Sequence, residues 1–169
     1  MANGVTYDDS RLTRLMEALS PAQRERALRN AFRAEARKVR KAAVKNLRGS
    51  GLKVNAEVEK GVRAVVYRQV AGFRVTIGTK GKRRDYSGMD DEEKKAAKAK
   101  ARLRVVPLWA DAGTWKRRNK RGKNRGSMPA YPFMTKTKRE MTPQVEESLR
   151  NQIVRSIERT AKRYGCTTD

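Results

Sequence analysis

The chain has 169 residues, with 42 Lys and Arg against 18 Asp and Glu, no His and a formal net charge of +24. The sequence has no His, and Cys166 is its one cysteine. This composition excludes Ser-His-Asp and Cys-His catalytic arrangements and the usual zinc sites. The length suits a single domain. Because so large an excess of cations repels itself, we expect a polyanionic or acidic neighbour: nucleic acid, an acidic protein surface or anionic lipid.

No segment of the sequence has the character of a membrane anchor. No apolar run approaches the roughly 20 residues that a membrane helix needs. The first ten residues lack the basic region followed by an apolar one that marks a signal peptide. A single cysteine allows no internal disulfide, which suits a reducing compartment. We therefore expect a single domain over residues 1–169 that makes no membrane contact.

The N-terminal part predicts an extended arm over residues 1–9, a short helix that Ser10 could cap, and then a long helix. Residues 20–23, Ser-Pro-Ala-Gln, form a capping box with proline at the first helical position, and Gly49 supplies a stop. Apolar residues of this long helix recur at steps of three and four as one narrow stripe: Leu28, Phe32, Ala36, Val39, Ala43 and Leu47. Its other faces carry cations that are either solvated or contact a phosphate backbone or an acidic protein ring: Arg33, Arg37, Arg40 and Lys41.

The apolar period then changes from helical spacing to two. Residues 62–66 and 73–77 alternate as strands with one buried face do, and the segment 70–72 would let them pair as a hairpin. Residues 79–101 are a charged insertion, in which acidic residues precede lysines as the helix dipole favours; we expect a solvated helix or a flexible segment there. Residues 102–109 predict a third strand, which Pro107 would place at an edge or a bulge.

A basic loop is predicted over residues 113–127. Trp115 and Tyr131 flank it and could stack on a base or a guanidinium. Its cations fit contact with a nucleic-acid backbone or with protein subunits, and a solvated loop is the alternative: Lys116, Arg117, Arg118, Lys120, Arg121, Lys123 and Arg125.

The C-terminal part predicts a second long helix. Residues 128–133 must be extended around their prolines. The helix is expected to begin at residues 142–143, Thr-Pro, to end near Tyr164 and to leave residues 165–169 as a tail. Its apolar row matches the narrow stripe of the first long helix: Val145, Leu149, Ile153, Ile157 and Ala161. We therefore expect an α+β fold in which two long helices pack together on one face of a small, mostly antiparallel sheet, with extended basic loops and an N-terminal arm.

Two acidic features were considered as chemical sites. Residues 90–93, Asp-Asp-Glu-Glu, could attract a divalent cation, but their place at the start of a lysine-rich helix favours a solvated first turn. Asp111 lies where its carboxylate could meet an arginine or cap a turn, and this structural role outweighs acid–base chemistry. We expect no enzymatic activity, metal or cofactor.

The order of these features resembles that of the tail-completion, or neck, proteins of long-tailed bacteriophages. In that family a long basic helix leads to a strand pair, a further strand ends in an acidic residue, one spacer and Gly-Thr, and a Pro-aromatic-Pro-Phe segment precedes the closing helix. The resemblance covers roughly residues 10–164, although this chain adds the insertion 79–101 and lengthens the basic loop. Seven residues fit the family positions as structural anchors: Trp109, Asp111, Gly113, Thr114, Pro129, Pro132 and Phe133.

The resemblance implies a structural virion protein, assembled in the host cytoplasm, that forms a ring at the head–tail junction. Six- or twelve-fold rings are expected, in contact with connector and tail proteins that present acidic surfaces, and with DNA contact left open. The alternative is a basic nucleic-acid-binding protein of ribosomal or nucleoid type, and a third interpretation is a small nuclease or other phage enzyme. A steep dependence of nucleic-acid binding on salt would favour the nucleic-acid-binding protein. Carboxylates that converge on a metal would favour the nuclease.

Overall fold

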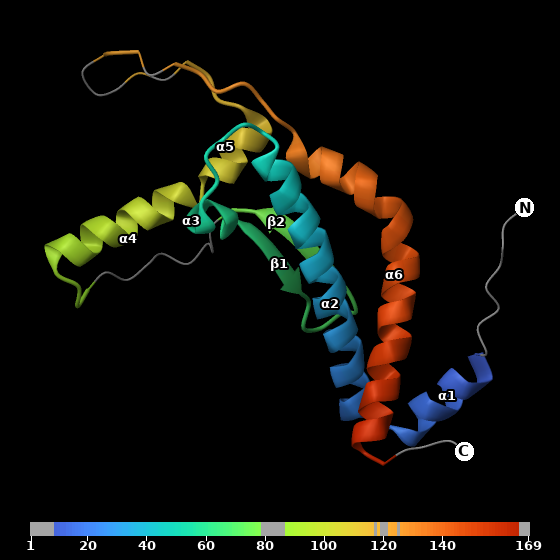
Figure 1. Cartoon of the computed structure of the whole chain (residues 1–169). Coiled ribbons are helices and arrows are strands. Elements are labelled where there is room, and N and C mark those ends of the chain that lie inside the picture. The colour runs from blue at the N-terminus through green and yellow to red at the C-terminus, as the bar shows by residue number, and fades with distance from the viewer. Residues whose placement is uncertain (1–8, 79–86, 117, 119–121, 125, 166–169) are drawn as a thin grey trace, which may run out of the picture.

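Two long helices, α2 (Pro21–Arg48) and α6 (Phe133–Arg163), lie side by side and form the body of the molecule (Figure 1). The computed structural model describes residues 9–78, 87–116, 118, 122–124 and 126–165. The arm predicted for residues 1–9 therefore lies outside the described residues but for Asp9, as do residues 79–86 of the insertion and 166–169 of the tail.

The first part of the chain follows the local signals closely. Ser20 Oγ accepts a hydrogen bond from the Gln23 amide at 3.4 Å, and Gln23 Oε1 accepts one from the Ser20 amide at 2.8 Å, so the predicted capping box is confirmed. At the other end of α2 the Gly49 amide donates to the Lys45 carbonyl. The short helix α1 (Asp9–Ala18) is also confirmed, but it begins before Ser10, which lies inside it and does not cap it.

Helices α2 and α6 run antiparallel and are joined by polar contacts along their length, three of which mark their alignment. Ser156 Oγ donates to the Ala27 carbonyl and Ser148 Oγ to Glu35 Oε2, both at 2.7 Å. Asn46 Nδ2 donates to Thr137 Oγ1 at 3.0 Å. The predicted pairing of the two helices is confirmed, but the buried face of α2 differs from the narrow stripe, because Leu28 and Val39 are only half-buried whereas further residues are buried: Ala27, Ala31, Glu35, Val44 and Asn46.

The predicted start of the last helix at residues 142–143 is wrong. Helix α6 begins at Phe133, and Pro143 lies within it. A proline inside a helix removes one main-chain hydrogen bond and usually bends the helix. Figure 1 shows α6 changing direction part-way along its length. The residues before the bend therefore reach the core near the end of α2, while those after it follow α2 along its length.

The sheet has two strands, β1 (Val62–Val66) and β2 (Phe73–Ile77), which pair antiparallel with Val62 opposite Ile77. The Tyr67 amide donates to the Gly72 carbonyl and closes the predicted hairpin, which is confirmed. The third strand predicted over residues 102–109 is wrong: this segment forms the end of α4 (Asp91–Leu103) and the start of α5 (Val106–Ala112). Pro107 is the second residue of α5. Backbone N–H groups in the first turn of a helix have no partner within the helix, so proline loses no hydrogen bond there.

The helix expected in the charged insertion is α4, and it extends away from the body (Figure 1). Asp90 Oδ1 accepts from the Glu93 amide at 2.7 Å, and Glu93 Oε2 accepts from the Asp90 amide at 3.4 Å, which forms a second capping box. None of the 13 residues of α4 is buried. Its stability therefore comes from its cap and its charge order more than from packing.

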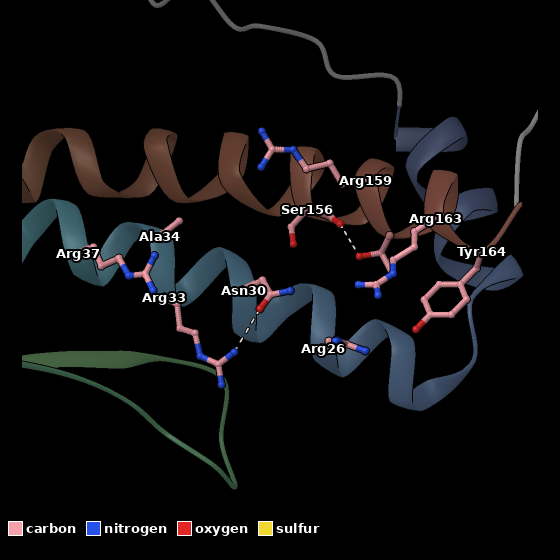
Figure 2. A pocket seen from close by; sticks show the side chains of 10 residues that line it. Arg26, Asn30, Arg33, Ala34, Arg37, Ser156, Arg159, Arg163 and Tyr164 are labelled. Carbon is pink, nitrogen blue, oxygen red and sulfur yellow. Dashed lines mark hydrogen bonds between the residues drawn. The ribbon is translucent and has the colours of Figure 1, made fainter.

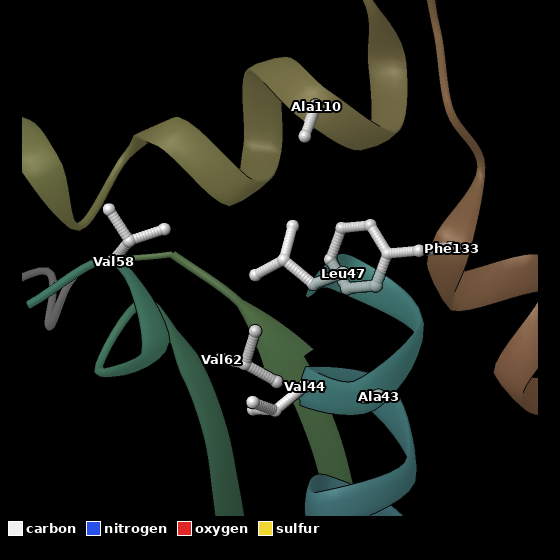
Figure 3. Close-up of a cluster of buried hydrophobic side chains, with 7 residues drawn as sticks. All are labelled: Ala43, Val44, Leu47, Val58, Val62, Ala110 and Phe133. Atoms are coloured by element: carbon white, nitrogen blue, oxygen red, sulfur yellow. The ribbon is translucent and has the colours of Figure 1, made fainter. Parts of the chain in front are cut away.

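The main core cluster joins five elements, because it contains residues of α2, α3 (Ala56–Glu59), β1, α5 and α6 (Figure 3). Its members are Ala43, Val44, Leu47, Val58, Val62, Ala110 and Phe133. A second, smaller cluster fixes α1 against the end of α6 through Leu15, Leu19, Ala27, Ile157 and Ala161. The fold is thus α+β, with α2 and α6 packed together and on the two-stranded antiparallel sheet.

A pH-dependent contact holds α3 to the end of α4. Glu57 accepts hydrogen bonds from Lys60 at 2.5 Å and from the Arg104 guanidinium at 2.9 Å, and these keep the pKa of Glu57 below its ordinary value of 4.5. A carboxylate with a lowered pKa contributes stability above its ordinary pKa and loses it as the pH falls through the folded value. We expect the variant Glu57→Gln to lose part of the decline in unfolding free energy below pH 4.5.

Urea denaturation across that pH range measures this effect, with Glu147→Gln at an exposed position inside α6 as the matched control. The control should keep the acid slope of the parent chain. Identical slopes for both variants would show that the Glu57 contact does not contribute.

Candidate polyanion and partner interface

The basic loop (residues 113–127) leaves the body through a paired base. The Thr114 amide donates to the Met128 carbonyl, and the Met128 amide donates to Thr114 Oγ1, both at 2.9 Å. Further out, Arg118 and Asn124 form an isolated antiparallel bridge. Figure 1 shows the described residues of the loop extending away from α5 and α6. The loop is therefore a projecting arm with a fixed origin.

Gly113 is the residue at which the chain turns out of α5. Its φ of +73° is a conformation that other residues rarely adopt. A Cβ placed there would also lie 3.0 Å from the Ala130 amide nitrogen. A glycine at position 113 therefore lets the chain turn sharply as it leaves α5, which is a helix and not the strand expected from the sequence.

Asp111 and the residues before α6 form one structural unit. Asp111 Oδ1 accepts a hydrogen bond from the Met134 amide at 2.9 Å, which satisfies one of the free N–H groups in the first turn of α6. The Tyr131 amide donates to the Ala110 carbonyl at 2.7 Å. Pro132 directs Phe133 inward, where the ring is fully buried. The cap that was expected of Asp111 thus serves a helix 23 residues away in sequence.

The substitution Asp111→Ala should lower the free energy of unfolding by about 1 kcal/mol, within the range for loss of a helix cap. Asp111→Asn should retain most of this stability, because its side-chain oxygen still accepts the Met134 N–H. Chemical denaturation of the two variants measures the difference. Equal losses in both would contradict the capping role.

Aromatic residues at the base of the loop differ in their exposure. Trp115 is 93 % exposed, as a stacking residue must be. Tyr131 is half-buried and packs against the main core cluster, so its predicted role in stacking on a ligand is not supported. Trp109 is half-buried in α5, and Pro129 is exposed beside the paired base. Of the candidate cations in the loop, Lys116, Arg118 and Lys123 are exposed, whereas Arg117, Lys120, Arg121 and Arg125 lie outside the described residues.

The four candidate cations on α2 have different surroundings. Arg33, Arg37 and Lys41 are exposed. Arg40 makes two hydrogen bonds within the fold: its Nε donates to the Val62 carbonyl at 2.8 Å and its Nη2 to the Glu59 carbonyl at 3.0 Å. Arg40 therefore ties α2 to the entrance of β1, and its contact with a polyanion stays a prediction.

Arg33 and Arg37 line a groove between α2 and α6, with a volume of about 450 Å³ (Figure 2). Three further arginines that the sequence interpretation missed also line it: Arg26, Arg159 and Arg163. The signal for them was present as steps of seven and four on α2 and of four on α6, which place side chains on one face of a helix. This spacing alone does not predict the groove, because it does not show that the arginine-bearing faces of α2 and α6 meet at this end of the helix pair.

The described residues contain no group of three or more His, Cys, Asp and Glu that could hold a metal ion. Within the same part of the chain, no helix has the length and apolarity to cross a bilayer. Asp90 and Glu93, considered above for a cation, cap α4 instead. Comparison with protein-family models, with curated proteins and with solved structures finds no match to this chain.

Proposed function

We propose that this chain is a structural subunit of the neck of a tailed-bacteriophage virion, where it completes the tail or joins it to the head as one member of a ring. The resemblance described above is one support. A second is that Asp111, Gly113, Thr114 and Phe133 act together in the fold, since they turn the chain out of α5, pair the base of the basic loop and start α6.

The observation that carries the proposal is that two elements project from the body and bury little of themselves. Helix α4 has no buried residue, and the basic loop presents Trp115 with 93 % of its surface exposed. Elements of this kind gain little from folding alone and gain burial when neighbouring subunits cover them. Identical subunits that cover each other head to tail form a closed ring.

An apolar hollow beside the sheet also favours association. It has a volume of about 680 Å³ and lies between α2, β2 and α6. Its wall includes Val39, Phe73, Val75, Met141 and Leu149, none of which is fully buried. Partly exposed apolar side chains gathered in one hollow gain burial when a neighbouring subunit covers them.

Charge defines the partners in this proposal. Subunits of charge +24 repel one another strongly when gathered in a ring. Neighbouring connector and tail proteins with acidic surfaces offset that repulsion, so the ring assembles between them. A six- or twelve-fold ring suits the symmetry of such neighbours.

A genetic experiment tests this function. A phage whose copy of the reading frame carries an early stop codon should produce filled heads and separate tails, visible by negative-stain electron microscopy, and supplying the chain in trans should restore joined particles. Complete, infectious virions formed without the chain would contradict the proposal.

A further inference from the structure

A groove at the end of the body near α1 gathers five arginines from two helices. Arg26, Arg33 and Arg37 come from α2, and Arg159 and Arg163 come from α6 (Figure 2). Among the residues that the structure describes, no carboxylate lines the groove. Five cations held in one hollow repel each other, and an anion placed among them relieves that repulsion.

The five groove arginines are not neutralised by local carboxylates. Three arginines elsewhere in the described part of the chain do have such partners: Arg29 pairs with Glu25, Arg48 with Glu59, and Arg104 with Glu57. Among the described residues none of the five groove arginines pairs with a carboxylate, and Arg33 donates to the Asn30 side-chain oxygen at 3.2 Å. Their guanidinium groups are therefore available for an external anion, which they can bind in bidentate fashion.

The arginines form a row. Arg26, Arg33 and Arg37 follow one face of α2, and at 1.5 Å per residue they span about 16 Å along the helix axis. Because α6 runs antiparallel, Arg159 and Arg163 supply the opposite wall near the Arg26 end. A row of cations between two walls matches a ligand whose negative charge repeats along its length, as in a nucleic-acid strand.

The lining of the groove is unlike that of a protein-docking surface. Protein interfaces are centred on apolar or aromatic anchors in desolvated pockets. Here the side chains other than arginine are small or polar, and the one aromatic residue is Tyr164, which lies at one end of the groove and is 43 % exposed. A tyrosine in that place suits stacking against a base. An acidic peptide would find charge in the groove but no apolar anchor.

We propose that this groove binds the phosphodiester backbone of one nucleic-acid strand through Arg26, Arg33, Arg37, Arg159 and Arg163. A volume of about 450 Å³ accommodates part of a single strand, whereas a duplex could only lie across the rim. The inference does not rest on the neck assignment. The site is tested by binding and the neck function by particle assembly, so either can fail without the other.

The test is the affinity for a short fluorescein-labelled single-stranded DNA, measured by fluorescence anisotropy at several salt concentrations. The triple variant Arg33→Gln, Arg37→Gln, Arg159→Gln removes three groove cations. The control Arg14→Gln, Arg74→Gln, Arg139→Gln removes the same charge from exposed positions outside the groove. Circular dichroism melts establish that both variants fold.

Three lost phosphate contacts should weaken binding about 100-fold near 0.1 M salt and reduce the slope of log K against log salt by about 2. The control variant should bind within a few-fold of the parent chain. Equal losses in the two variants would overturn the proposal, because binding would then follow total charge. Tighter binding of poly-glutamate than of the oligonucleotide, with the same dependence on the groove arginines, would also overturn it in favour of an acidic protein ligand.

Discussion

Replacing Phe133 by alanine should lower the free energy of unfolding by about 3–5 kcal/mol, the range measured for loss of a large aromatic side chain from a core. Phe133 is fully buried and is the first residue of α6. Its ring packs in the cluster that joins α2, α3, β1, α5 and α6 (Figure 3). Because it is the α6 member of that cluster, its loss weakens the hold of α6 on the rest of the core.

Guanidinium denaturation followed by circular dichroism measures this effect. Trp115→Ala is the matched control, since it also removes a large aromatic side chain but one that is 93 % exposed. The control should change the free energy of unfolding by no more than about 0.5 kcal/mol. Similar losses for the two variants would show that Phe133 is not a core residue.

Gly61→Ala should destabilise the fold by about 1–3 kcal/mol or more, because the site has no room for a side chain. A Cβ on Gly61 would lie 2.3 Å from the Arg104 carbonyl oxygen and 2.9 Å from Pro107 Cγ. Both belong to the junction between α4 and α5, which presses on the start of β1. The main-chain oxygen can move only with its segment, so the substitution separates α5 from the sheet.

The control for this substitution is Gly49→Ala at the end of α2. Gly49 has a φ of −70°, which any residue adopts, and its nearest neighbour would be the Asn46 carbonyl oxygen at 3.3 Å. We expect a change below about 1 kcal/mol there. Chemical denaturation compares the two variants, and an equally mild effect at Gly61 would contradict the close approach of the α4–α5 junction.

The parts of the fold that the sequence predicted correctly depend on neighbouring residues. The capping box at residues 20–23 and the acid-to-base order of α4 involve partners within one helical turn. The alternation over residues 62–66 and 73–77 pairs across a short turn. In each case the residues that decide the structure lie close together in sequence, so the pattern itself contains the information.

Two of the wrong predictions concern prolines. The sequence predicts an edge strand or bulge at Pro107 and a helix start at Pro143. Pro107 occupies the first turn of α5, and Pro143 lies inside α6, a helix that changes direction part-way along its length (Figure 1). Proline is disfavoured inside a regular helix or strand, but it is compatible with the first turn of a helix and with a bend in one. Which of these applies depends on contacts with Gly61 and with α2 that the local sequence does not contain.

The buried polar residues of α2 were also beyond prediction from the sequence. Glu35 is fully buried and accepts from Ser148, and Asn46 donates to Thr137 and, at 2.7 Å, to Glu140. These partners lie more than 90 residues away in the chain. A charged or amide side chain looks solvent-facing in a helical pattern until its partner helix is known.

In the candidate site, too, some features follow from the local sequence and others only from the packing of distant segments. The exposure of Lys116, Arg118 and Trp115 follows from a loop whose composition is polar and basic. The arginine groove, by contrast, exists only because α6 lies antiparallel to α2 and brings Arg159 and Arg163 to the same hollow as Arg33. Arg40 is the opposite case. Its place in the sequence of α2 predicts an exposed cation, but its guanidinium donates to the main-chain carbonyls of Glu59 and Val62.

Native mass spectrometry of the purified chain, alone and mixed with connector and tail proteins of the proposed virion, tests the proposed assembly between counter-charged surfaces most directly. At low ionic strength the chain alone should give monomers or small species, because subunits of charge +24 repel each other. Adding an acidic connector or tail protein should produce a closed ring of defined mass. A ring that forms from the chain alone at low ionic strength, or a chain that stays monomeric with every neighbour, would contradict the account.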